Sequence, residues 1–119
     1  MLLSDVKAII NAEILTGESD ASLSEKDIHT ALGSDLMSDV LAFVDEQTML
    51  LTGLINSQVI RTAEMMDITA ICFVRGKMPA EDVIALANEK GIAILSTPKT
   101  MYSSCGLLYT NGIRGIEND

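Results

Sequence analysis

The middle of the chain, residues 48–98, repeats one unit three times: a short apolar strand, a small polar loop and an amphipathic helix. The three strand-and-loop stretches read MLLTGLIN (49–56), ITAICFVRGKMP (68–79) and IAILSTPKT (92–100). Apolar runs of this length, alternating with helical patterns about ten residues long, predict βαβ crossovers and a parallel sheet. We therefore expect an α/β fold, as one three-layer domain whose mainly parallel sheet has about five strands.

The length of 119 residues suits one domain that spans residues 1–119 and folds on a single core. Hydrophobic residues make up 48% of the chain and aromatic residues only 3%, so we expect a core that is aliphatic and rich in methionine. The glycine-containing tail, residues 110–119, is predicted to be frayed.

The charge of the chain excludes several partners. A formal net charge of −9 with a pI near 4.4 argues against a nucleic-acid binder and against attraction to an anionic membrane. No apolar run approaches the roughly 18 residues of a membrane-spanning helix, and the first residues lack the pattern of a signal peptide. The two cysteines, Cys72 and Cys105, form no Cys-x-x-Cys motif. A reduced, cytoplasmic protein is the simplest interpretation, with Cys72 in the core and Cys105 either buried or a surface thiol.

The first part of the chain is predicted from shorter signals. Ser4 is expected to cap a helix that ends near Ala12. Residues 13–17 and 27–32 are expected to be strands, and the polar stretch 18–24 a loop between them.

A helix is predicted over residues 36–44, and it is apolar around an unusually wide arc. Either it is sandwiched within its own domain, or part of it faces a second copy of the chain. In the second case the chain is a homodimer, and the interface residues are Met37, Val40, Leu41 and Val44. Further helices are expected over residues 57–66, 80–90 and 101–109, with Gly91 ending the second of them.

Four loops are expected along one edge of the sheet, because parallel strands place their carboxyl ends together. Each loop leads into a helix whose free N–H groups favour anions, and Arg75 and Lys77 add positive charge. The candidate ligand-binding residues are Ser34, Asp35, Thr52, Gly53, Asn56, Arg75, Gly76, Lys77, Ser96, Thr97 and Thr100. The alternative is structural: serine, threonine and asparagine before helices are caps, and glycine serves the turns.

Patterns of catalytic and metal sites are missing from the sequence. It holds no Walker-type phosphate loop, no G-x-G-x-x-G and no set of metal ligands at the usual spacing, and the single His29 has no catalytic partner near it in sequence. We expect a protein that is not an enzyme and that has no metal and no cofactor.

Three segments resemble the DRTGG domain, a small α/β module found in phosphotransacetylases, beside CBS domains and as stand-alone proteins near iron-hydrogenase genes. They are residues 33–41 (GSDLMSDVL), 51–53 (LTG) and 92–98 (IAILSTP), and the resemblance covers about residues 5–108. The family's Asp-Arg pair falls on Leu54-Ile55, and its Thr-Gly-Gly on Val74-Arg75-Gly76. The resemblance implies the fold of the MurF N-terminal domain and of the N-terminal domain of HPr kinase/phosphorylase.

The resemblance also implies a regulatory or ligand-sensing dimer without an active site. Together with the charged loops it favours a homodimer that binds a small anionic or nucleotide-like ligand at the carboxyl edge of the sheet. The alternative is an interaction subunit without a ligand, docked through the 36–44 helix onto a redox enzyme, such as an iron-hydrogenase, or onto another protein.

Overall fold

The computed structural model describes residues 1–17, 25–40 and 47–116 of the chain. Within these ranges the helices are α1 (Leu3–Ile9), α2 (Met37–Val40), α3 (Ser57–Met65), α4 (Glu81–Glu89) and α5 (Met101–Thr110). The strands are β1 (Glu13–Ile14), β2 (Thr30–Gly33), β3 (Thr48–Thr52), β4 (Ala70–Phe73), β5 (Ala93–Ser96) and β6 (Arg114–Gly115). The three long helices predicted after the central strands are thus confirmed to within one residue at each end.

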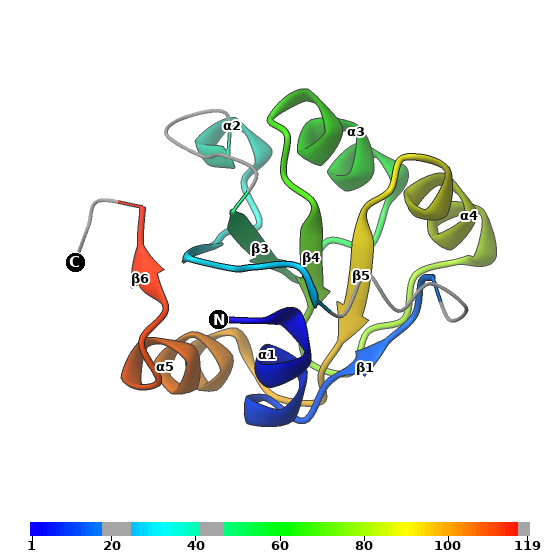
Figure 1. Cartoon of the computed structure of the whole chain (residues 1–119). Helices are drawn as coiled ribbons and strands as arrows, with labels where there is room; N and C mark the ends of the chain where they lie inside the picture. The colour runs from blue at the N-terminus through cyan, green and yellow to red at the C-terminus, as the bar shows by residue number, and fades with distance from the viewer. Residues whose placement is uncertain (18–24, 41–46, 117–119) are drawn as a thin grey trace.

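The strands form one sheet in the order β1-β5-β4-β3-β2-β6 (Figure 1). All neighbouring strands from β5 to β6 are parallel, and only β1 runs antiparallel, beside β5. The predicted α/β fold with a mainly parallel sheet is confirmed. The described residues form six strands, where the sequence predicted about five.

Helices cover both faces of the sheet, which makes the three predicted layers. Every residue of β3, β4 and β5 is buried, as expected for parallel strands covered on both sides. Side chains from alternate positions point to opposite faces, and two hydrophobic clusters result. One cluster joins the sheet to α1 and α5, and the other joins it to α2, α3 and α4, as Figure 1 shows below and above the strands.

The core is aliphatic, as predicted, and methionine contributes one fully buried side chain and several partly buried ones at its margins. Among the described residues, Phe73 is the one buried aromatic side chain and Met49 is the one fully buried methionine. Met65 and Met78 are exposed instead. Isoleucine, leucine, valine and alanine fill most of the buried positions, and the flexible side chains of Met1, Met37, Met66 and Met101 pack partly buried at the margins of the two clusters.

The first helix begins earlier than its predicted cap. Ser4 lies inside α1 and is exposed, and the N-cap residue is Leu2, without a side-chain hydrogen bond. The Leu3 N–H donates to the Lys26 carbonyl at 2.8 Å and Leu2 bridges to Asp27, so the helix begins where this extended pairing ends. The strands predicted over residues 13–17 and 27–32 are shorter, and the loop predicted at 18–24 lies outside the described residues.

The helix predicted over residues 36–44 is described only as far as Val40. Val40 is fully buried in the cluster between α2, α3 and the sheet, so it is a core residue and its predicted place in a dimer interface is wrong. Met37 is half-buried against the same cluster. Leu41 and Val44 lie outside the described residues.

The carboxyl-terminal tail is ordered further than predicted. After α5 the chain turns at Gly112, buries Ile113 and pairs β6 with β2 in parallel. The prediction of a frayed tail is therefore wrong as far as residue 116. The burial of Ile113 against α1, α5 and the sheet explains why this segment is held.

Candidate functional site

The loops that follow β2, β3, β4 and β5 lie at one edge of the sheet, as the sequence predicted. We call residues 34–36, 53–56, 74–80 and 97–100 the rim. Backbone hydrogen bonds tie its loops together: the Arg75 N–H donates to the Lys99 carbonyl and the Gly76 N–H to the Thr97 carbonyl, both at 2.8 Å. Arg75 has a φ of 61° and Gly76 a φ of 69°, so both take the left-handed backbone that a tight turn here requires.

Asp35 is the centre of the rim's polar contacts. Its Oδ1 accepts a hydrogen bond from the Gly53 N–H at 2.6 Å and another from the Thr52 hydroxyl at 3.0 Å. The Gly53 N–H above all holds the pKa of the Asp35 carboxyl below its usual value, with help from Thr52, Arg75 and Lys77 and against partial burial. Asp35 is therefore an ionised carboxylate at neutral pH, bound to donors on the neighbouring loop.

Gly53 lies between that carboxylate and a guanidinium. A Cβ placed on Gly53 would stand 3.4 Å from Oδ1 of Asp35 and 3.5 Å from Nη2 of Arg75. The Gly53 carbonyl, in turn, accepts a hydrogen bond from Nζ of Lys77 at 2.9 Å. Both cations that the sequence singled out thus lie beside Gly53, and the missing side chain leaves room for charged groups from two other loops.

Two of the predicted donors are used inside the fold. The Ser96 hydroxyl donates to the Lys77 carbonyl at 2.9 Å, and the Thr97 hydroxyl donates to the Ile10 carbonyl at 2.6 Å. Both side chains are buried. They hold the β4–α4 loop and the end of α1 onto β5.

Three other predicted residues act as caps or turn residues. Oδ1 of Asn56 accepts from the Val59 N–H and caps α3, and Oγ1 of Thr100 accepts from the Ser103 N–H and caps α5. The Ser34 hydroxyl accepts from the Leu36 N–H within its own loop. These contacts match the structural alternative that the sequence left open.

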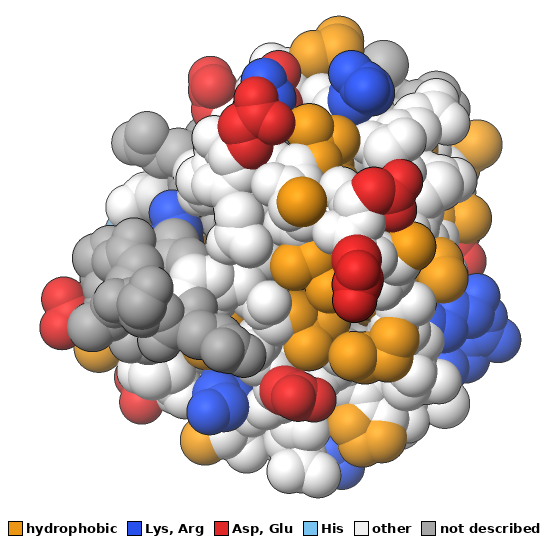
Figure 2. Space-filling model, turned by 90° about the vertical axis from the view of Figure 1, so that its right-hand side faces the viewer, with side chains coloured by type: hydrophobic (Ala, Val, Ile, Leu, Met, Phe, Trp, Pro, Cys, Tyr) orange, Lys and Arg blue, Asp and Glu red, His pale blue; other side chains and the backbone are white. Residues whose placement is uncertain are grey.

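The rim gathers positive charge in an acidic chain. Three of the eight lysines and arginines, Arg75, Lys77 and Lys99, lie on its loops. Lys99 was not among the predicted site residues, although the scarcity of cations in the sequence is a signal that could have identified it. By contrast, Figure 2 shows the side of the molecule where α4 lies, with hydrophobic side chains gathered in the middle among acidic ones.

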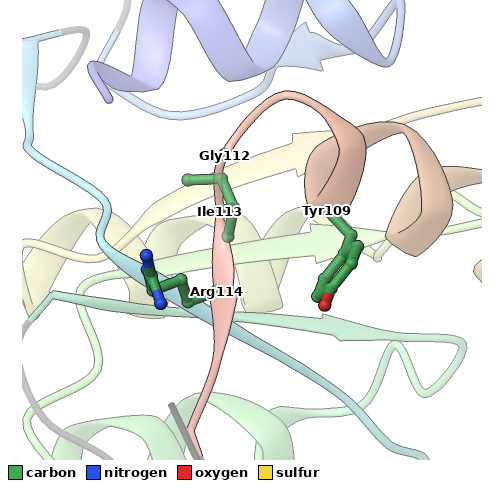
Figure 3. A pocket seen from close by; sticks show the side chains of 4 residues that line it. All are labelled: Tyr109, Gly112, Ile113 and Arg114. Carbon is green, nitrogen blue, oxygen red and sulfur yellow. The ribbon is translucent and has the colours of Figure 1, made fainter. Parts of the chain in front are cut away.

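The larger cavities lie away from the rim. Two overlapping cavities of about 300 and 440 Å³ are lined by the turn from α5 into β6, and the second also by His29 and Met1. In Figure 3 the side chains of Tyr109 and Arg114 lie on opposite sides of the β6 backbone and do not point toward a common centre. None of the predicted site residues lines these two cavities or two smaller ones.

The remaining reactive groups form no second centre among the described residues. Nε2 of His29 lies 2.7 Å from Oδ2 of Asp27 on the surface. Burial raises the pKa of Cys72 to about 12 and also raises the pKa of the half-buried Cys105, so both remain thiols at neutral pH. In the described parts of the chain no three histidine, cysteine or acidic side chains are grouped as metal ligands, and no helix is long and apolar enough to cross a membrane.

A solved structure shares this fold. It is the crystal structure of the CBS and DRTGG domains of the regulatory region of Clostridium perfringens pyrophosphatase, complexed with its activator diadenosine tetraphosphate. The match has a TM-score of 0.68 at 13% sequence identity and covers 98% of the present chain. The present chain spans 48%, about half, of the chain in that structure.

Comparison with curated protein sequences gave no match. The sequence profile of the DRTGG domain, in contrast, matches residues 5–110, which is most of the chain. The resemblance found in the central loops is therefore confirmed, and the chain belongs to the DRTGG domain family.

Proposed function

We propose that this protein is a non-enzymatic regulatory module that binds a small anionic, nucleotide-like ligand at the rim and acts as a homodimer. The DRTGG domain of the pyrophosphatase belongs to a regulatory region, and that protein's activator is a dinucleotide. This supports a regulatory role for the present chain, and the choice of ligand rests on the rim itself.

One observation carries the proposal: the rim already holds an anion, which is the protein's own Asp35. The Gly53 N–H and the Thr52 hydroxyl donate to it, and Arg75 and Lys77 lie close by. Two directed donors with two nearby cations are what a phosphate oxygen needs. A phosphorylated ligand fits this arrangement better than a neutral one.

The experiment is a thermal-shift screen of the whole chain with adenine nucleotides, dinucleoside polyphosphates and other phosphorylated metabolites. A ligand at about 100 times its dissociation constant should stabilise the fold by roughly 2.7 kcal/mol. Arg75→Ala should abolish most of that gain. Arg61→Ala is the matched control, since Arg61 is an exposed arginine on α3 outside the rim, and it should keep the gain. If no compound shifts the melting temperature, the ligand proposal fails.

A second function, that of an interaction subunit without a ligand, is favoured by exposed apolar side chains on the rim and at the start of α5. Leu36 is 59% exposed, Met78 is 52% exposed, and Tyr102 near the start of α5 is 89% exposed. Exposed large apolar side chains are typical of protein-binding surfaces. A chain that binds a protein partner but shows no stabilisation by any phosphorylated compound would favour this function over the first.

A further inference from the structure

The groups that hold Asp35 are fixed by the fold, whereas Asp35 comes from another loop. Gly53 and Thr52 belong to the end of β3, where Thr52 is fully buried. The Thr52 hydroxyl also accepts from the Leu54 N–H at 3.2 Å, and the Gly53 carbonyl is held by Lys77. Asp35 itself is exposed and stands on the short connection from β2 to α2.

An incoming phosphate would need the same donors. The Gly53 N–H has one hydrogen to give, and Asp35 uses it at 2.6 Å. Two anions at this position would repel each other, and the only compensating charges there come from Arg75 and Lys77 among the described residues. A ligand oxygen can therefore take the position only when the Asp35 carboxylate leaves it.

We propose that Asp35 is a built-in competitor for the anion at the rim, so that ligand binding displaces its carboxylate and moves the connection between β2 and α2. The inference rests on the proposed function. Its consequence is a route by which the ligand acts at a distance: α2 begins two residues after Asp35, and Val40 anchors that helix in the core. Release of Asp35 changes how the start of α2 is held.

The test is isothermal titration of the whole chain with inorganic pyrophosphate, comparing wild type with Asp35→Asn. Asparagine keeps the shape and one acceptor but loses the charge, so it is easier to displace. The variant should bind pyrophosphate about tenfold more tightly, since a hydrogen bond to a charged group outweighs one to a neutral group by an amount of this order. Asp82→Asn is the matched control: Asp82 lies exposed in the first turn of α4 at the same edge, and its loss should change affinity by much less.

A second measurement uses only the wild-type chain. In proton–nitrogen NMR spectra, pyrophosphate should shift the amide signals of Gly53 and of Leu36 with the same dissociation constant, because one event moves both. This measurement keeps the inference testable even if the substitution perturbs folding.

The outcomes separate the two proposals. The competitor role is overturned, with anion binding left intact, if Asp35→Asn binds pyrophosphate no more tightly than the wild type or if Asp35→Asn and Asp82→Asn gain equally. It is also overturned if the amide signal of Leu36 does not respond to pyrophosphate. If neither wild type nor Asp35→Asn binds pyrophosphate or any nucleotide, the proposed function fails and the competitor role fails with it.

Discussion

At the scale of single residues, a buried polar atom is expected to have a hydrogen-bond partner, and Ser104 is the exception to this rule. Its side chain is fully buried in α5, and its hydroxyl has no hydrogen-bond partner among the described residues. A buried hydroxyl without a partner costs free energy of folding, and alanine is also the better helix former. Ser104→Ala should therefore raise the free energy of unfolding by about 1 kcal/mol, measured by urea denaturation.

The neighbouring serine gives the control for this prediction. Ser103 is exposed in the same helix, so Ser103→Ala changes helix propensity alone and should stabilise by about 0.5 kcal/mol or less. Ser104→Ala should exceed it. A loss of stability in Ser104→Ala would mean that the hydroxyl makes a favourable contact that its surroundings do not reveal.

The charged groups around Gly53 could not be predicted from the sequence of its own loop alone. The family's Asp-Arg pair falls on Leu54-Ile55, and both residues are half-buried and apolar. An acid and an arginine nevertheless flank Gly53, because Asp35 comes from the loop before and Arg75 from the loop after. Their meeting depends on the parallel register of β2, β3 and β4, which no single stretch of sequence contains.

At the scale of elements, the caps of the helices separate structural residues from candidate ligand residues. Asn56→Ala removes the side chain that caps α3 and should lower the free energy of unfolding by about 1 kcal/mol. It should leave the affinity for pyrophosphate unchanged, whereas Arg75→Ala should lose affinity. Denaturation and titration of the same samples check both parts.

Helix α4 has no capping side chain, so a cap can be added there rather than removed. The N-cap residue of α4 is Ala80, which has no side-chain hydrogen bond, so Ala80→Ser should stabilise the chain by about 1 kcal/mol. For the cap of α3, in contrast, weaker pyrophosphate binding by the Asn56→Ala variant would contradict a purely structural role and show that Asn56 contacts the ligand as well as the helix.

The elements that could be predicted are those with a strong local pattern. The buried strands β3, β4 and β5 and the amphipathic helices after them follow from runs of apolar residues and helical spacing. In contrast, β6 is two residues long and has an arginine in it, so only its pairing with β2 makes it a strand. The roles of Ser96 and Thr97 likewise depend on partners 19 and 87 residues away in sequence.

At the scale of the whole molecule, the proposed homodimer has to overcome repulsion between two acidic chains. Each chain carries a formal charge of −9, so association should strengthen as salt screens the repulsion. Val40 is buried in the core, so among the described residues near the start of α2 the accessible apolar side chains are Leu36, which is exposed, and Met37, which is half-buried.

Light scattering of the purified chain tests this association. The wild type should have twice the mass of one chain, 12.8 kDa, and Leu36→Glu combined with Met37→Lys should have the mass of one, since charges buried in an apolar interface lose their hydration. Met65→Lys is the control, because Met65 is exposed on α3 away from that surface, and its mass should stay that of the wild type. A wild type with the mass of one chain would refute the homodimer. An unchanged mass in the double variant would refute this surface as the interface, while circular dichroism shows whether the variant is folded.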